Sequence, residues 1–208
     1  MRWPDFELDP ARPVFLLSPG HGIDTAGKRS PGKKTPDDGR PGIVEYEFNR
    51  DIARRVARAA TVRGIQVIDL VPQEMNIPLR ERVRRANDIH EHTPAVFFAI
   101  HANASGGGGW SRARGARVFV APVSSQASRE LARSFNARIQ ERVPEFRGYS
   151  RVREAGFFEL KRTKMPAILT ENGFMTSRYD CAVLESEAGR EAIALAHVDT
   201  MLDYLGDQ

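Results

Sequence analysis

Short apolar runs alternate with longer mixed segments along this chain of 208 residues. Apolar runs of roughly four to eight residues, bounded by Pro, Gly or polar residues, are typical of buried strands. The pattern predicts strands over residues 14–17, 65–71, 95–100, 116–121 and 167–170, with a further short strand over 157–160.

The segments between these runs place apolar residues at the spacing of an amphipathic helix. They predict helices over residues 45–63, 79–92, 124–143 and 187–205. In the first of these, Phe48, Ile52 and Val56 share a face, and Gly64 is placed to end the helix. Because strands and helices alternate from end to end, we expect one α/β domain built on a mainly parallel sheet.

Three of the predicted strands lead into a residue that can do chemistry. The first runs through Ser-Pro-Gly into His21, and the runs ending at positions 100 and 170 lead into His101 and Glu171. In open α/β sheets, ligands bind outside the carboxyl ends of the strands. We therefore expect these three side chains to face one crevice. Residues 22–42 form a long loop beside it, and loops of that length in compact domains are usually functional.

Two histidines in equivalent positions indicate a metal site, because histidine is the commonest protein metal ligand and carboxylates accompany it at zinc. Glu45, which opens the first predicted helix, is a candidate third ligand. Each residue also has a structural interpretation. A histidine after a strand can simply be hydrogen-bonded, and an acid such as Glu45 suits the positive end of a helix.

The remaining histidines and the single cysteine lack such a setting. We expect His90 and His92 at the surface or at a helix end, and His197 on or near the core face. Cys181 has no histidine nearby in sequence, so we interpret it as a small apolar residue and not as a nucleophile.

Composition and net charge limit the classes of molecule that the protein is expected to bind. One cysteine excludes an intrachain disulfide, and the apolar fraction of 41% is ordinary for a globular protein. The net charge of +4 favours binding to an anionic polymer. It is equally explained by a solvated, arginine-rich surface with no such partner. The chain lacks the interleaved basic and aromatic residues of a nucleic-acid binder, so we do not expect nucleic acid as a partner.

Four motifs occur in order along the chain: SPGHG with His21, VEYEFN with Glu45 and Asn49, AIHANA with His101 and Asn103, and MPAILTENGF with Glu171. Together they resemble the zinc-dependent N-acetylmuramoyl-L-alanine amidases of the amidase-3 group. The likeness extends over residues 14–205, which is nearly the whole chain.

The resemblance implies a twisted, mainly parallel sheet of about six strands with helices on both faces. It implies that His21, Glu45 and His101 bind one Zn²⁺ per chain and that Glu171 is the catalytic carboxylate. It also implies a hydrolase that cleaves the amide bond between N-acetylmuramic acid and L-alanine in peptidoglycan, with the catalytic domain over residues 14–208.

The sequence departs from the family pattern beside the catalytic glutamate. Thr170 stands where the strand usually ends in valine, and Asn172 stands where an apolar residue is common. We expect Asn172 and Gly173 to turn the chain away from the strand and to leave the carboxylate of Glu171 facing the metal.

Two further expectations concern the site. Glu47 is a rival metal ligand, but the spacing from Glu45 to Asn49 favours Glu45. Some cell-division members of the family carry a helical insertion that blocks the site. The connection between His101 and Arg117 is too short for such an insertion, so we expect an open site.

The lead-in over residues 1–13 is interrupted by acids and prolines and lacks the apolar centre of a signal peptide. No window approaches the ~20 apolar residues that a membrane span needs. We therefore expect a protein that is made in the cytoplasm, resembles a single-domain phage endolysin, and acts on the wall after release with a holin-type permeabilising protein. A bacterial autolysin of the same activity and a non-catalytic peptidoglycan-binding module are the alternatives.

Overall fold

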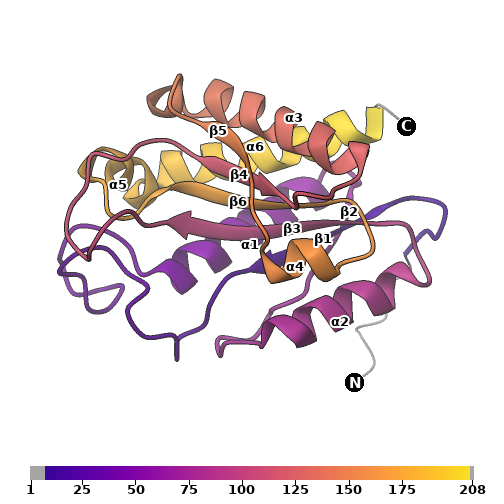
Figure 1. Cartoon of the computed structure of the whole chain (residues 1–208), viewed down its shortest axis with the longest axis horizontal. Helices are drawn as coiled ribbons and strands as arrows, with labels where there is room; N and C mark the ends of the chain where they lie inside the picture. The colour runs from indigo at the N-terminus through magenta and orange to yellow at the C-terminus, as the bar shows by residue number, and fades with distance from the viewer. Residues whose placement is uncertain (1–7, 207–208) are drawn as a thin grey trace.

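The computed structural model describes residues 8–206, and within this range six strands form one sheet in the order β2-β1-β3-β6-β4-β5 (Figure 1). Every neighbouring pair is parallel except β4 and β6, which are antiparallel. The strands are β1 (Val14–Pro19), β2 (Gln66–Asp69), β3 (Ala95–Asn103), β4 (Arg117–Val120), β5 (Arg151–Glu154) and β6 (Ala167–Phe174).

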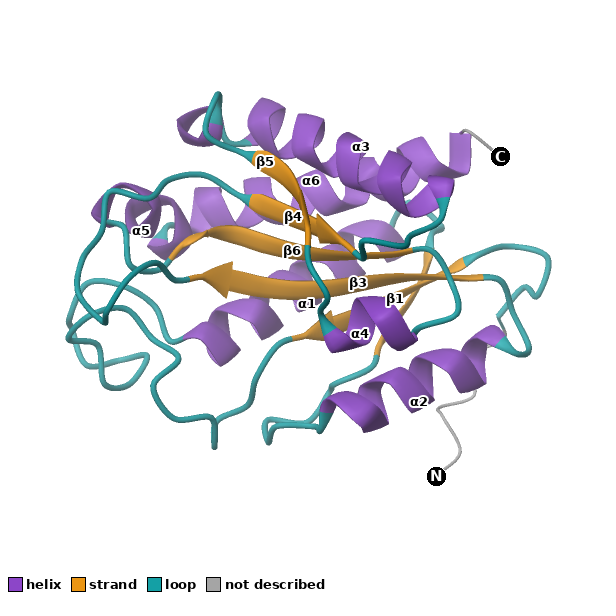
Figure 2. Ribbon diagram, viewed as in Figure 1, coloured by secondary structure: helices purple, strands orange, loops and turns teal. Residues whose placement is uncertain are grey.

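Six α-helices accompany the sheet in the described range, together with one short 3-10 helix, η1 (Pro144–Phe146). They are α1 (Glu45–Thr61), α2 (Leu79–His90), α3 (Gln126–Arg142), α4 (Phe158–Arg162), α5 (Arg178–Glu185) and α6 (Glu187–Gly206). Helices α1, α3 and α6 pack on one face of the sheet, and α2 and α4 pack on the other (Figure 2). The predicted fold class, a mainly parallel α/β sheet covered on both faces, is confirmed.

Alternation along the central strands divides the core into two layers. Phe15 and Leu17 of β1 lie in the cluster formed with α1, α3 and α6, whereas Val14 and Leu16 lie in the cluster on the α2 side. All four side chains are fully buried. A strand covered on both faces must be apolar throughout, which is why β1 is a continuous hydrophobic run. No helix in residues 8–206 combines the length and apolarity needed to cross a membrane.

One sequence prediction about an element is wrong, and two elements were missed. The segment predicted as a strand over 157–160 contains the start of helix α4, where Glu159, Leu160 and Lys161 are good helix formers and Leu160 packs into the core on the α2 side. Strand β5 and helix α5 were not predicted. All four residues of β5 are exposed, so it has no apolar run to reveal it.

The ends of the two central strands also differ from expectation. Strand β3 continues to Asn103 and β6 continues to Phe174, so His101 and Glu171 lie inside strands and not just beyond them. Asn172 and Gly173 do not turn the chain away. They form an irregularity in the pairing of β3 with β6, where Gly173 adopts a φ of 106°. Of the predicted lead-in, residues 1–7 lie outside the described residues.

Candidate metal centre

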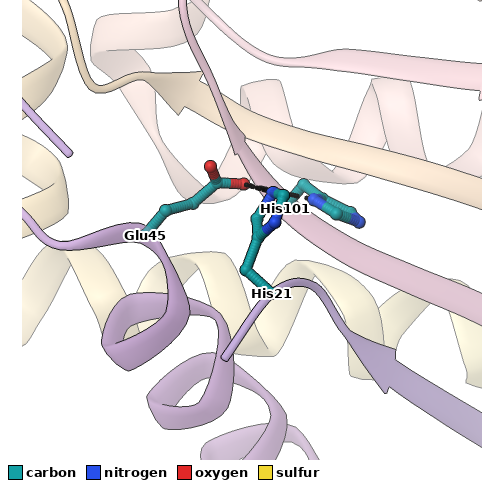
Figure 3. A group of neighbouring side chains, drawn as sticks. All are labelled: His21, Glu45 and His101. Carbon is teal, nitrogen blue, oxygen red and sulfur yellow. Dashed lines mark hydrogen bonds and ion pairs between the residues drawn. The ribbon is translucent and has the colours of Figure 1, made fainter. Parts of the chain in front are cut away.

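His21, Glu45 and His101 converge at the carboxyl ends of β1 and β3 (Figure 3). Oε1 of Glu45 lies 3.3 Å from Nε2 of His21 and 3.1 Å from Nδ1 of His101. The two imidazole rings are nearly perpendicular, with centroids 5.2 Å apart. One ligand atom from each residue fits within 4.8 Å of the other two, which makes this a group that could hold a metal ion.

Tight backbone packing brings the two histidines together. A Cβ atom at Gly20 would lie 2.0 Å from Cε1 of His101, so only glycine allows the backbone just after β1 to approach that ring. His21 itself has a φ of 64°, the only positive value at a non-glycine position among the described residues. Its neighbour Gly22 is equally constrained, because a Cβ there would lie 2.0 Å from the backbone nitrogen of Asn76.

Arg82 of α2 holds this turn in place through hydrogen bonds to main-chain oxygens. This residue was not identified from the sequence. Its guanidinium is buried and donates to the main-chain oxygen of Pro19 at 2.7 Å, to that of His21 at 3.5 Å and to that of Ile77 at 2.8 Å. The buried charge therefore stabilises the loop that presents the first histidine. The local sequence does not predict this contact, because Arg82 is one of several arginines in this helix and its partners are main-chain oxygens of distant residues.

Glu45 is the first residue of α1 and is almost wholly buried. Burial acts to raise the pKa of its carboxyl group, but hydrogen bonds with His101 and His21 outweigh burial and hold the pKa well below its usual range. Asn49, one turn further along α1, donates to the main-chain oxygen of Gly20 at 3.2 Å and so ties the helix to the histidine loop. Glu45 is thus a carboxylate at neutral pH.

The donor set fits zinc. Two imidazoles and one ionised carboxylate are ligands that Zn²⁺ takes at catalytic sites with an open position. Within the described range, the ion pairs of Glu45 are with His21 and His101 alone, so no lysine or arginine competes for its charge. Burial disfavours the charged form of His101, but its hydrogen bond to Glu45 and the charge of Glu171 raise its pKa.

Glu171 lies beside this group. It is the register partner of His101 on the adjacent strand β6, so both side chains project from the same face of the sheet. Its Oε2 atom is buried and has no hydrogen-bond partner among the described residues. Burial raises the pKa of Glu171 to about 7. A carboxyl group with that pKa can accept and release a proton near neutral pH.

A buried polar network supports the strand from the opposite face. Asn172 donates from Nδ2 to the main-chain oxygen of His101 at 3.0 Å and to Oγ1 of Thr170 at 3.2 Å. Oγ1 of Thr170 lies 3.0 Å from Nε2 of His197, whose Nδ1 lies 2.9 Å from the main-chain oxygen of Ile193. Because a carbonyl oxygen only accepts, Nδ1 carries the proton and Nε2 accepts from the Thr170 hydroxyl.

This network explains the departures from the family pattern. Thr170 and Asn172 are polar because they pair with one another and with His197, which the sequence placed correctly on the core side. Burial lowers the pKa of His197 to about 4, so its imidazole is neutral at pH 7.

The rival residues lie elsewhere. Glu47 turns away from the metal group and pairs with Arg190 of α6 at 3.1 Å. His90 is the last residue of α2, and His92 is exposed, as expected. Cys181 is buried, and burial raises the pKa of its thiol to about 11, which agrees with its interpretation as a small apolar residue.

The surroundings of the group leave it partly accessible. The side chain of His21 is 21% exposed and that of His101 is 15% exposed. The connection between β3 and β4 contains no helix. The expected absence of a helical insertion is therefore confirmed in this connection, all of which the structure describes.

A family model described as N-acetylmuramoyl-L-alanine amidase matches residues 15–203, which is most of the chain. The chain belongs to the amidase-3 family. Among relatives of this amidase-3 protein, the N-acetylmuramoyl-L-alanine amidase LytC of Bacillus subtilis (strain 168) is 27% identical over 193 residues, which cover 92% of this chain and 35% of LytC. The endolysin of Bacillus phage SPP1 is 26% identical over 194 residues, which cover 92% of this chain and 66% of the endolysin.

Solved amidase structures share the fold of this amidase-3 chain. The N-acetylmuramoyl-L-alanine amidase from Clostridium difficile 630 superposes with a TM-score of 0.80 and 28% sequence identity, covering 96% of this chain and 99% of that one. The curated relatives are longer. This chain spans about a third of LytC and about two thirds of the phage endolysin.

Proposed function

We propose that the protein is a zinc-dependent N-acetylmuramoyl-L-alanine amidase whose catalytic unit spans residues 14–208. It hydrolyses the amide bond between the lactyl group of N-acetylmuramic acid and the L-alanine of the peptide stem. The observation that carries the proposal is the convergence of His21, Glu45 and His101 beside Glu171, whose Oε2 has no hydrogen-bond partner among residues 8–206, in a chain of the amidase-3 family. The names of its relatives support the choice of bond.

His21, Glu45 and His101 would hold one zinc ion per chain. When bound, zinc supplies a Lewis acid that polarises the scissile carbonyl and lowers the pKa of water toward about 7. The protein prepares for this in two ways. The pKa of Glu45 lies well below its usual range, so a negative charge is already present, and the buried Arg82 and Asn49 fix the loop that carries His21.

Glu171 acts as general base and then as general acid. Its carboxylate accepts a proton from the attacking water and passes that proton to the amine nitrogen of L-alanine as the amide bond breaks. Burial raises the pKa of this carboxyl group above its usual range, which makes it a better proton acceptor than an exposed glutamate. Its position beside His101 on the same sheet face favours this role.

Digestion of purified cell walls tests the proposal. Mass spectrometry of the products should show peptides with a free L-alanine amine and glycan strands whose muramic acid carries a free lactyl carboxylate. Cleavage between other stem residues, or between sugars, would contradict the assignment of the bond. The Glu171→Gln protein, treated in parallel, serves as the control for contaminating wall hydrolases.

The biological setting that we propose is wall lysis of the endolysin type. Similarity to the endolysin of phage SPP1 supports this setting, while similarity to LytC supports a bacterial autolysin of the same activity. Release to the wall through a holin-type permeabilising protein stays a prediction. Co-expression with such a protein should cause lysis that the amidase alone does not cause.

A further inference from the structure

A row of paired residues leads away from the metal group across the sheet. His101 pairs with Glu171, Glu171 pairs with Arg117 of β4, and Arg117 pairs with Arg151 of β5. Directly paired residues project from the same face, and neighbouring strands lie roughly 4.8 Å apart. The row therefore runs from His101 and Glu171 to two arginines, Arg117 and Arg151. All four side chains project from the same face of the sheet.

A second row runs parallel to the first. Phe119 of β4 pairs with Leu169 on one side and with Arg153 of β5 on the other. The ring of Phe157 stacks edge-on against Phe119 at a centroid distance of 5.1 Å and is 38% exposed. This face of the sheet therefore carries two aromatic side chains, Phe119 and Phe157, next to a third arginine, Arg153. The connection from β5 to α4 crosses the front of the sheet and borders this surface (Figure 1).

The three arginines lack neutralising partners. Arg151 and Arg153 are exposed, and in residues 8–206 none of the three arginines forms an ion pair with a carboxylate. Arg117 lies over the ring of Phe174 at 5.2 Å, and its Nη1 donates to the main-chain oxygens of Ala116 and Tyr149, each at 2.8 Å. Burial, followed by the positive charges of Arg153 and Arg151, lowers the pKa of Arg117.

We propose that Arg117, Arg151 and Arg153 form a subsite that binds the acidic part of the peptide stem. This inference rests on the proposed function, because it takes the scissile bond to lie between the metal group and Glu171. An extended peptide advances about 3.3–3.6 Å per residue, so the second stem residue lies roughly 7 Å from that bond. Neighbouring strands are about 4.8 Å apart, so the backbone of Arg117 lies about that far from the backbone of Glu171. Arg151 is one strand further and lies about twice that distance from Glu171.

The chemistry of the stem matches this placement. In peptidoglycan the second stem residue is D-glutamate, linked through its side chain, whose α-carboxyl group is either free or amidated. The planar fork of arginine binds a carboxylate through two parallel hydrogen bonds and binds a neutral amide less strongly. The three arginines therefore favour stems in which the α-carboxylate is free. Phe119 and Phe157 provide an apolar contact for the rest of the stem.

Binding of the isolated stem tests the subsite without requiring catalysis. The probes are the tripeptide L-Ala-γ-D-Glu-L-Lys and its counterpart with an amidated α-carboxyl group, titrated into the zinc-loaded protein and followed by NMR chemical shifts. We expect a Kd about tenfold lower for the acidic probe. In Arg151→Gln and Arg153→Gln, each an exposed edge-strand substitution, this ratio should fall to about twofold or less.

Arg63→Gln is the matched control, because Arg63 is exposed beyond the end of α1 and precedes β2, the edge strand at the opposite side of the sheet from β5. It should keep the tenfold preference. Equal affinities for the two probes in the wild-type protein, or an equal loss in Arg63→Gln, would overturn the inference. Cleavage of the corresponding muramoyl tripeptides tests the proposed function separately, since that reaction can proceed with no preference between the two stems.

Discussion

His101 and Glu171 lie directly opposite one another on the adjacent parallel strands β3 and β6. One strand therefore presents a candidate metal ligand and its neighbour presents the candidate proton acceptor, with the backbone hydrogen bonds of the sheet fixing their separation. A site built on two paired strands is held more rigidly than one built on loops. The predictions below follow from this relationship and from the groups that support it.

Glu171→Gln should separate chemistry from metal binding. The amide keeps the shape of the side chain but cannot accept the proton, so turnover should fall at least about a hundredfold while the fold and the zinc content stay unchanged. Steady-state kinetics on a soluble muramoyl peptide and metal analysis check both points. A variant that loses its zinc would identify Glu171 as a ligand, and a variant with near-normal turnover would refute the assigned role.

His21→Ala and His101→Ala should each lose zinc and activity, because each removes one of three protein ligands. His90→Ala should keep both, since His90 ends α2 away from the group. Elemental analysis of protein purified without chelator measures the zinc content. Loss of zinc from a folded His90→Ala protein would show that the ligand set is wrong.

Thr170→Val should destabilise the protein although it keeps the shape of the side chain. The substitution removes the hydroxyl that Nε2 of His197 and Nδ2 of Asn172 both use, and leaves a buried acceptor without a donor. The free energy of unfolding should fall by about 1–3 kcal/mol. Urea unfolding monitored by circular dichroism measures this change, and an unchanged midpoint with an unchanged slope would refute the network.

Stability should decline as pH falls from about 6.5 toward 4, in part because of His197. The pKa of this buried imidazole is about 4 in the folded protein, below the usual value of about 6.5 in an unfolded chain. Between these values the unfolded chain binds a proton that the folded chain does not, so acidification favours unfolding. Above pH 6.5 the imidazole is neutral in both states and contributes no pH dependence.

Below pH 4 the loss of unfolding free energy that His197 causes reaches at most about 3 kcal/mol. Urea unfolding of the wild-type protein and of His197→Gln, at pH 7 and at pH 4.5, isolates it as the difference between their pH dependences. The variant should lose less stability than the wild-type protein over this interval. Parallel losses in both proteins would mean that other groups account for the decline.

Much of the site was predictable because the pattern of apolar runs is dictated by the core. His21, His101 and Glu171 could be placed at one edge of the sheet, since strands buried on both faces must be apolar and these residues follow the apolar runs. Glu45 was different. By propensity it is only an acid at a helix start, and the family motif identified it.

The remaining features depend on contacts between distant segments. Arg82 supports the His21 loop through main-chain oxygens that no local pattern reveals. Strand β5 is exposed on both faces and exists because it pairs with β4, and β3 and β6 extend past their apolar runs because each continues to pair with the other. The arginine rows became visible only when the register of four strands was known.

The central claim is that His21, Glu45 and His101 bind the zinc while Glu171 stands beside it without binding. Anomalous X-ray diffraction at the zinc absorption edge, on crystals of protein purified without chelator, tests this most directly. The account predicts one anomalous peak per chain, within bonding distance of about 2.0–2.2 Å of a nitrogen from each histidine and an oxygen of Glu45. A peak bonded to Glu171 in place of Glu45, or zinc bound only elsewhere on the chain, would contradict it.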